Sequence, residues 1–384
     1  MNWDKVKISE VYQGLYDGPH ATPPDSEDGA VFLGISNITK NGHIDLRNIK
    51  HINENDLPKW TKRVTPQGGD IVFSYEATLN LYAIIPDGFW GCLGRRMALI
   101  RPDESKAHGK YLYYYFFSEE WRATIAKNTI TGATVDRIPI AKFPDFPISL
   151  PPLEKQHIIA DRLAAYDSVI ENNQRQIELL EEAAQRIYKE WFVELHFPKH
   201  ENTFAEDGLP SGWRKGTLGE VAHFNRGKTI TKSQTMEGNI PVVAGGLEPA
   251  YYHNEANTKA PVITVSGSGA NAGFTRLYYE DVFASDCSYA DRNTTDYLFF
   301  VYCFLKSNMS QLDSLQKGSA QPHVYAKDIN ALKTLIPTKE ILSDFCKVVL
   351  PYFNMIGNLE KQNEKASEAR DRLLPKLMNG EIEI

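Results

Sequence analysis

The clearest pattern along the chain is a heptad repeat of apolar positions in two stretches. From Ile159 to Trp191, and again from Phe345 to Leu377, mostly apolar residues recur with alternating spacings of four and three. A period of 3.5 residues predicts helices that pair as a coiled coil rather than helices that lie on a sheet. Pro151 and Pro152 should stop the strand before the first helix, and Pro375 should end or kink the second near its last turn.

The chain also repeats itself. The segment Trp3–Val11 returns as Trp213–Val221, 210 positions later. From Tyr111 onward the matches fall 186 positions apart without gaps, and eight of the 21 residues from Tyr166 to Arg186 are identical at that offset. We therefore expect two copies of one unit, each a mixed module followed by a long helix.

Between the repeated motifs lie strand-like and helix-like runs. Ile71–Ser74, Val242–Ala244 and Pro261–Val265 are rich in β-branched and aromatic residues, and turns containing Gly, Asn or Pro separate such runs. One helix is predicted from Tyr111 to about Lys127, and its counterpart from Tyr297 to about Leu312. These patterns favour small, loop-rich modules.

The fold class is therefore α+β, with two loop-rich α/β modules separated by two long helices that pair as an antiparallel coiled coil. The expected boundaries are a first module over 1–152, a central helix over 153–196, a second module over 197–338 and a C-terminal helix over 339–384. A pseudo-twofold axis between the two copies requires the antiparallel arrangement.

A register for the helix pair follows from matching the two heptad seams. Each helix could form a zipper with a second copy of the chain, but pairing between the two helices of one chain is the simpler arrangement. If Asn173 meets Asn363, every seam position finds a partner, and the two amides could satisfy each other and fix the register. The alternative is a bundle in which Asn173 faces water. The residues expected to pair the helices are Ile170, Asn173, Ile177, Leu180, Ile356, Leu359 and Asn363, with Leu163 facing Leu373 and Trp191 facing Phe345.

Composition narrows the class of protein. A chain of 384 residues with 42% hydrophobic residues can bury a substantial core in two to three domains. Four scattered cysteines without CxxC spacing indicate neither a disulfide framework nor a zinc site. No secretory leader or membrane-length apolar run is recognisable, so a cytoplasmic location is expected.

The net charge of −7 argues against a self-sufficient basic DNA-binding protein. However, the charge is unevenly distributed. Residues 153–196 hold 5 basic and 9 acidic side chains, whereas residues 1–152 hold 17 and 18, and residues 197–338 hold 13 and 14. The excess acid lies mainly on the first helix, so nearly neutral modules can still present a local cationic loop.

Several phrases, in order along nearly the whole chain, resemble the specificity subunits of type I restriction–modification systems. They are Pro151–Gln156, Glu182–Val193, Gly208–Trp213, Leu218–Val221, Lys317–His323 and Leu373–Ile382. The resemblance implies a non-catalytic, DNA-reading subunit in which each module is a target recognition domain for one half of a bipartite double-stranded site. It also implies that the paired helices set the spacer and dock two methyltransferase subunits, which restriction and translocase subunits join. S-adenosylmethionine, ATP and Mg²⁺ are then expected on the partner subunits and none in this chain.

Base reading requires side chains such as Arg, Lys, Asn and Gln at a groove edge, with other contacts to phosphate. For each candidate, an ordinary solvated surface residue is the alternative, and the densest cationic loop is Arg226–Gln234. The resemblance cannot carry base-reading positions across, because recognition loops are where members of the family differ. The candidates are Lys62, Arg63, Arg95 and Arg96 in the first module and Arg226, Lys228, Thr229, Lys232, Gln234, Ser268, Asn271, Gln321 and His323 in the second.

Motifs for catalysis are incomplete. Gly227-Lys228-Thr229 lacks the first glycine of a phosphate-binding loop, because position 222 is Ala. The sequence also contains no Asn-Pro-Pro-aromatic motif for amine methylation and no metal-ligand spacing. No catalytic or metal site is therefore expected. Two other functions remain open. One is a stand-alone nuclease that uses Asp87, Glu104 and Lys106, and the other is a duplicated coiled-coil scaffold without a role on DNA.

Overall fold

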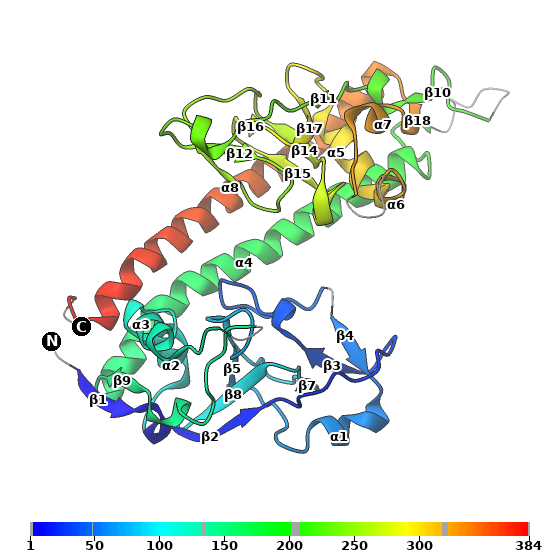
Figure 1. Cartoon of the computed structure of the whole chain (residues 1–384). Helices are drawn as coiled ribbons and strands as arrows, with labels where there is room; N and C mark the ends of the chain where they lie inside the picture. Colours follow the sequence, from blue (N-terminus) through cyan, green and yellow to red (C-terminus); the bar gives the residue numbers. More distant parts are fainter. Residues whose placement is uncertain (1–2, 48, 133–134, 201–207, 317–321, 383–384) are drawn as a thin grey trace. The chain divides into compact units, whose positions relative to one another are not determined.

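The computed structural model describes residues 3–47, 49–132, 135–200, 208–316 and 322–382. The chain divides into two compact units, one of Met1–Ile170 with Glu364–Ile384 and one of Glu171–Asn363. Each unit holds one module and part of the two long helices, α4 (Leu153–Phe192) and α8 (Lys339–Met378), which Figure 1 shows in green and red. Both helices have 40 residues, and their bounds lie 186 positions apart, the offset of the sequence repeat.

The first module has two sheets and a two-stranded ribbon. An antiparallel sheet has the order β2-β8-β5-β6, and a smaller sheet has the order β4-β3-β7 with β3 and β7 parallel. The ribbon pairs β1 with β9 and brings the start of the module to the strand that precedes α4. The bounds are β1 Asp4–Lys7, β2 Tyr12–Asp17, β3 Ala30–Leu33, β4 Lys50–Ile52, β5 Ile71–Ser74, β6 Tyr82–Ile84, β7 Gly91–Leu93, β8 Met97–Pro102 and β9 Pro147–Leu150, with a short helix α1 at Leu57–Trp60.

The second module repeats this topology strand for strand. Its sheets have the orders β11-β17-β14-β15 and β13-β12-β16, the pair β12 and β16 is parallel, and β10 pairs with β18. The internal repeat is therefore a duplication of the fold. The bounds are β10 Arg214–Thr217, β11 Asn225–Arg226, β12 Ile240–Val243, β13 Tyr251–His253, β14 Val262–Ser266, β15 Thr275–Tyr278, β16 Phe283–Ala284, β17 Cys287–Asp291 and β18 Lys333–Ile336, with a short helix α7 at Ala326–Asn330.

The prediction of one continuous helix in each module is wrong. The first module has α2 (Gly109–Tyr115) and α3 (Glu119–Asn128), and the second has α5 (Leu298–Ser307) and α6 (Met309–Ser314). Ser118 caps α3 because its hydroxyl accepts a hydrogen bond from Trp121 N at 3.2 Å. A side chain that competes in this way with the backbone ends one helix and starts the next.

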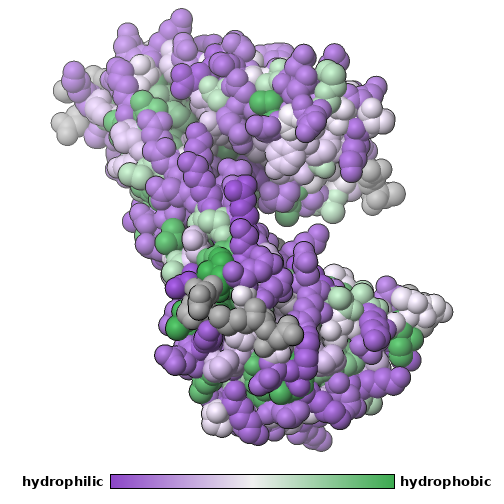
Figure 2. Space-filling view, turned by 90° about the vertical axis from the view of Figure 1, so that its left-hand side faces the viewer, coloured by the Kyte–Doolittle hydropathy of each residue, from purple (hydrophilic) through white to green (hydrophobic). Residues whose placement is uncertain are grey.

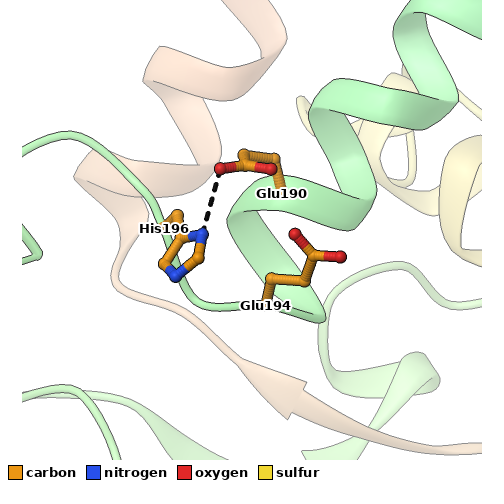
Figure 3. Close-up of side chains that lie close together, drawn as sticks. All are labelled: Glu190, Glu194 and His196. Atoms are coloured by element: carbon orange, nitrogen blue, oxygen red, sulfur yellow. Dashed lines mark hydrogen bonds and ion pairs between the residues drawn. The ribbon is translucent and has the colours of Figure 1, made fainter.

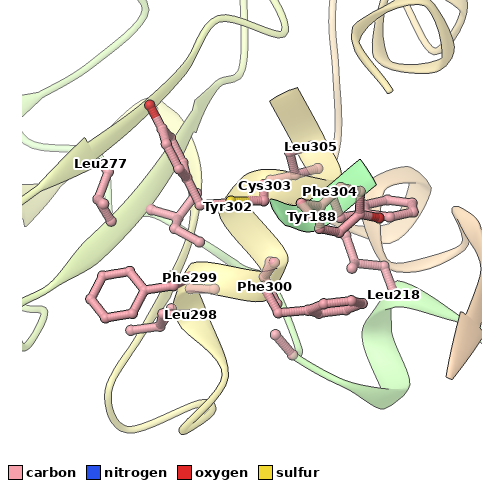
Figure 4. Packing of buried hydrophobic residues seen from close by; sticks show 14 of the residues in the cluster. Tyr188, Leu218, Leu277, Leu298, Phe299, Phe300, Tyr302, Cys303, Phe304 and Leu305 are labelled. Atoms are coloured by element: carbon pink, nitrogen blue, oxygen red, sulfur yellow. The ribbon is translucent and has the colours of Figure 1, made fainter. Parts of the chain in front are cut away.

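Aromatic residues form the core of each unit. In the second unit every residue of α5 from Leu298 to Leu305 is buried, and Figure 4 shows most of these side chains together with Tyr188 of α4, whose ring centroid lies 5.7 Å from that of Phe300. The Phe299 and Phe353 rings stack with centroids 4.5 Å apart, which ties α5 to α8. On the face drawn in Figure 2, hydrophilic residues cover most of the surface and hydrophobic residues form only small patches.

The two long helices pair antiparallel within each unit. In the second unit Trp191 lies against Phe345, with ring centroids 5.8 Å apart, as the sequence register requires. In the first unit Arg370 of α8 contacts Asp167 of α4. Of the predicted pairing residues, Ile177, Ile356 and Leu359 are buried in one apolar cluster, Leu180 packs against that cluster, and Ile170 is half-buried.

Two details of the helix pair differ from the expectation. Asn173 is buried but donates to Gln362 Oε1 at 3.4 Å, while Asn363 Oδ1 is buried without a hydrogen-bond partner in the described part of the chain. The prediction that the two asparagines satisfy each other is therefore wrong. In addition, the helices have a second buried stripe that includes Tyr188 and Phe192, because they also pack against the module helices. As expected, α8 ends close to Pro375, three residues later at Met378.

Candidate nucleic-acid interface

In the second module, three strands of the larger sheet bring their loops to one edge. The antiparallel ladder pairs Ser266, the last residue of β14, with Cys287, the first residue of β17. Arg226 at the end of β11 pairs with Ser288. Because the ends of these strands are hydrogen-bonded neighbours, the loops that follow or precede them lie side by side.

The cationic loop is held at this edge through its backbone. Lys228 N donates to Ala284 O at 2.9 Å, and Gly227 N donates to Cys287 O at 2.8 Å. A Cβ on Gly227 would lie 2.2 Å from Ser285 O, so only glycine permits this close approach. The Gln234 side chain accepts from Thr231 N at 2.9 Å and so stabilises its own turn, although it is also exposed.

The glycine-rich turn and the segment around His323 join the same loop cluster. Ser268 forms an isolated β-bridge with His323, and Gly269 N donates to Pro322 O at 3.1 Å. Asn271 Nδ2 contacts Gly245 O at 3.5 Å. Ser268, Asn271 and His323, which lie up to 55 positions apart in the sequence, are thus brought together, whereas the candidate Gln321 lies outside the described residues.

Arg226, Lys228 and Lys232 are exposed, and no ion pair neutralises any of them within the described residues. Thr229 is exposed beside them. This set of free cations next to an exposed hydroxyl group is the arrangement that phosphate contacts require. The edge of the β11-β17-β14-β15 sheet is therefore the candidate nucleic-acid interface of the second module, and we call it the second loop edge.

Sequence reasoning missed two residues of the second loop edge. Tyr325 stacks on His323 with ring centroids 5.9 Å apart and an interplanar angle of 13°. The alternation of His323 and Tyr325, two positions apart in an extended segment, was the signal that could have placed both on one face. Asp286, an exposed carboxylate next to β17, accepts a hydrogen bond from the Ser268 hydroxyl.

The corresponding edge of the first module, the first loop edge, contains some of the predicted cations. Arg63 Nη1 lies 2.5 Å from Asp17 Oδ1, and Arg96 Nε lies 3.7 Å from Glu76 Oε2. These two cations are therefore neutralised within the module. Lys62 and Arg95 are exposed and have no ion-pair partner in the described part of the chain, which leaves them available to an anionic ligand.

Non-glycine residues with left-handed backbone angles gather in these loops. Arg96 has φ 78°, Ala77 has φ 67° and Asn80 has φ 60°. Arg96 precedes β8, while Ala77 and Asn80 lie in the loop between β5 and β6. Such conformations each cost roughly 1–3 kcal/mol and are commonly kept where loop shape serves binding.

A family profile described as the type I restriction modification DNA specificity domain matches residues 2–182 and 210–366. The two matched segments contain the two modules and most of both long helices. This chain belongs to the type I restriction–modification DNA specificity family. Membership agrees with the resemblance found in the sequence and makes the chain a non-catalytic specificity subunit.

Named relatives cover nearly the whole specificity subunit. The type I restriction enzyme MjaIX specificity subunit of Methanocaldococcus jannaschii is 26% identical over 404 residues, which is 99% of this chain and 89% of that protein. The HindI specificity subunit of Haemophilus influenzae is 20% identical over 443 residues, 92% of this chain and 94% of that protein. A crystal structure of the S subunit from M. genitalium superposes with a TM-score of 0.58 at 18% identity, covering 98% of this chain and 96% of that one, and so shares the fold.

Two of the three residues of the alternative nuclease function have partners within their own loop. Glu104 accepts from Gly109 N at 2.9 Å and contacts His108, whereas Lys106 pairs with Asp103 at 3.4 Å. Both side chains therefore serve their own loop in the specificity subunit. None of the helices within the described ranges is long and apolar enough to cross a membrane.

Glu190, Glu194 and His196, at the end of α4, are the one group of three potential metal ligands within the described residues. Sequence spacing had not singled them out. Figure 3 shows Glu190 and His196 pointing toward each other, with Nδ1 and Oε1 3.0 Å apart. Lys189 lies 3.1 Å from Glu194 and lowers the pKa of that carboxyl. Because these exposed groups already pair with one another and with Lys189, we assign no metal to them.

Proposed function

We propose that this specificity subunit selects the DNA site on which a type I restriction–modification complex acts, and that each module reads one half of a bipartite double-stranded sequence. The observation that carries the proposal is the second loop edge. There, free cations and polar side chains from segments far apart in sequence meet on one edge of the larger sheet, next to a glycine turn. Cations suit phosphate, and the polar side chains suit base edges.

The duplication supports a divided site. Both modules have the same strand order, and each ends its central strands in a loop edge. The residues in the two loop edges differ, however, since free cations and a glycine turn mark the second, while two of the four cations in the first are paired with carboxylates. Two modules of one architecture with different loops are suited to reading two different half-site sequences.

We further propose that α4 and α8 set the spacer between the half-sites and dock two methyltransferase subunits. A helix of 40 residues is about 60 Å long, which exceeds the roughly 34–36 Å between successive major-groove sites on one face of DNA. Several apolar side chains on these helices are exposed, which suits contact with a partner protein. They are Val169 and Leu179 on α4, and Val348, Leu350 and Met355 on α8.

The chemistry of the complex is assigned to the partners in this proposal. S-adenosylmethionine would bind to the adenine methyltransferase subunits, and ATP and Mg²⁺ to the restriction and translocase subunits. In support, the chain contains neither a complete phosphate-binding loop nor an Asn-Pro-Pro-aromatic motif.

The test is to express the chain with its methyltransferase partner and map methylated adenines across host DNA. The expected result is a split motif whose halves change separately when residues 1–150 or residues 197–338 are replaced by those of a relative with another specificity. Expression of the methyltransferase alone is the control. If methylation does not depend on this chain, the proposal is wrong, and if neither exchange alters the motif, the modules are not the readers.

A further inference from the structure

Asp286 is fixed at the centre of the second loop edge. It lies between β16 and β17, its backbone carbonyl accepts from Gly267 N at 3.2 Å, and its carboxylate accepts from the Ser268 hydroxyl. The side chain is exposed. Both the backbone and one carboxylate oxygen are thus held by the glycine-rich turn, while the other oxygen remains available to a ligand.

The charge of Asp286 is not balanced by the neighbouring cations. Other acidic residues of this module form ion pairs, such as Asp281 with Lys259 and Glu220 with Arg214. Among the described residues Asp286 has no such partner, although the cationic loop adjoins it. A free carboxylate repels phosphate, so it disfavours DNA binding unless it faces a hydrogen-bond donor.

In the major groove the available donors are exocyclic amino groups. Cytosine presents its N4 amino group and adenine its N6 amino group, and acidic side chains accept hydrogen bonds from the former. A carboxylate at a DNA-facing loop edge is therefore matched to one class of base edge. The carboxylate would then favour bases that carry an amino group over bases that do not.

The first module has a matched pair of residues at the equivalent positions. In each module, the residue two positions after β5 or β14 contacts the residue immediately before the strand paired with it, which is β8 or β17. In the first module these are Glu76 and Arg96, and in the second they are Ser268 and Asp286. The same place in the fold thus carries a cation in one module and an anion in the other, as expected for a position that distinguishes two half-sites.

We propose that Asp286, oriented by Ser268, accepts a hydrogen bond from the amino group of a cytosine or adenine in the half-site read by the second module. The inference rests on the proposed function and adds to it a residue and a base chemistry. Ser268 acts as a positioning residue, because its hydroxyl holds one oxygen of Asp286 and leaves the other to the base.

The first experiment maps methylation by the full complex carrying Asp286→Asn, Asp286→Ala or the control Asp313→Asn. Asp313 is an exposed carboxylate on α6, which is not one of the segments that form the second loop edge. Both Asp286 variants should reduce discrimination at one base position of one half-site by roughly tenfold to a hundredfold, with the other half-site unchanged. The control should keep the full motif, and the retained half-site reports that the complex is intact.

The second experiment identifies the base by measuring DNA binding of the complex to duplexes that lack one amino group. 2-Pyrimidinone replaces cytosine and purine replaces adenine at the affected position. The wild-type complex should lose affinity with one of these analogues, whereas the Asp286→Ala complex should not. An unchanged motif in both Asp286 variants would overturn this inference alone. Absence of any motif with the wild-type chain would overturn the proposed function and this inference with it.

Discussion

Arg370 Nη1 lies 2.6 Å from Asp167 Oδ1 and joins α8 to α4 inside the first unit. The hydroxyl of Tyr114, on α2, donates to the other oxygen of the same carboxylate. Burial and the Asp167 carboxylate raise the pKa of Tyr114, so the phenol keeps its proton. Yet 186 positions away the equivalents of Tyr114, Asp167 and Arg370 are Phe300, Phe353 and Ala184, and two of these are stacked or packed aromatic residues. The first copy thus joins its helices through a buried ion pair, whereas the second copy uses aromatic packing at the equivalent positions.

Arg370→Ala should destabilise the first unit by about 3–5 kcal/mol, because it leaves Asp167 buried without its cation. The Arg370 and Asp167 side chains are only 13% and 12% exposed. The control is Arg372→Ala, which removes a pair with Glu368 whose side chains are 76% and 56% exposed and should cost less than about 1 kcal/mol. Denaturant unfolding of the two variants measures the difference, and equal losses would contradict the assignment.

Replacing the ion-paired residues of the first copy by the apolar residues of the second should restore the stability lost in Arg370→Ala. The triple variant Tyr114→Phe, Asp167→Phe, Arg370→Ala should be at least 2 kcal/mol more stable than Arg370→Ala alone, because no charge is then left buried. The same unfolding measurement tests this. A triple variant no more stable than the single one would show that the space around Arg370 cannot accept the aromatic ring.

Glu360 should make the second unit less stable as the pH rises. Burial, together with Glu181 and Glu280, raises the pKa of Glu360 to about 7, above the value of about 4.3 expected in the unfolded chain. The folded state binds this proton more tightly than the unfolded state does. The resulting contribution to the unfolding free energy is fully present below pH 4 and is lost as the pH rises toward 7, at up to about 1.4 kcal/mol per pH unit. Comparing the unfolding free energy of the wild type and Glu360→Gln across pH 4 to 8 isolates this carboxyl, and parallel curves would contradict the prediction.

The helix register predicts which cysteine pairs can crosslink. Ile177→Cys with Leu359→Cys should form a disulfide under mild oxidation, because the register that brings Trp191 against Phe345 and Asn173 to Gln362 places Ile177 opposite Leu359. Ile177→Cys with Tyr352→Cys, one heptad away, is the control and should not. The half-buried Cys346 is replaced by Ser in both. Crosslinking of the control pair alone would show that the register is wrong.

The free cations of the second loop edge should contribute to DNA affinity without regard to sequence. Arg226→Ala and Lys228→Ala should each weaken binding of the complex and reduce the slope of log affinity against log salt by about 1. Arg214→Ala, which removes a cation already paired with Glu220 at 2.6 Å, should leave the slope unchanged. Titration at several salt concentrations gives these slopes, and equal slopes for all three variants would place DNA elsewhere.

The helices and the duplication could be predicted because both depend on patterns that can be seen directly in the sequence, namely the heptad spacing and the repeated segments. Seam residues such as Ile177 and Leu359 recur every 3.5 positions, and that period determines which face is buried. The second stripe, with Tyr188 and Phe192, could not be predicted from the same pattern, because it depends on where α5 packs. The split between α2 and α3 was missed because one capping hydroxyl, that of Ser118, outweighed a continuous aromatic run.

The loop edges could be predicted only in part. Glycine, cationic and polar residues identified the Arg226–Gln234 loop and the turn at Ser268 as surface loops. The carboxylates that neutralise Arg63 and Arg96 lie 46 and 20 positions away and meet them only through the strand order of the sheet. Asp286 was missed for the same reason, because its contact with Ser268 depends on the pairing of β14 with β17.

Gly357 of α8 lies directly against the ring of Tyr279, and a Cβ there would come within 2.7 Å of ring carbons. The equivalent position in the first copy is Glu171, which is exposed. The ring of Tyr279 in the second module therefore requires glycine at position 357 of α8, whereas the equivalent position of α4 carries a glutamate. A different module placed before α8 would therefore have to supply a side chain that packs against Gly357, and the two modules of this chain are not interchangeable at this position.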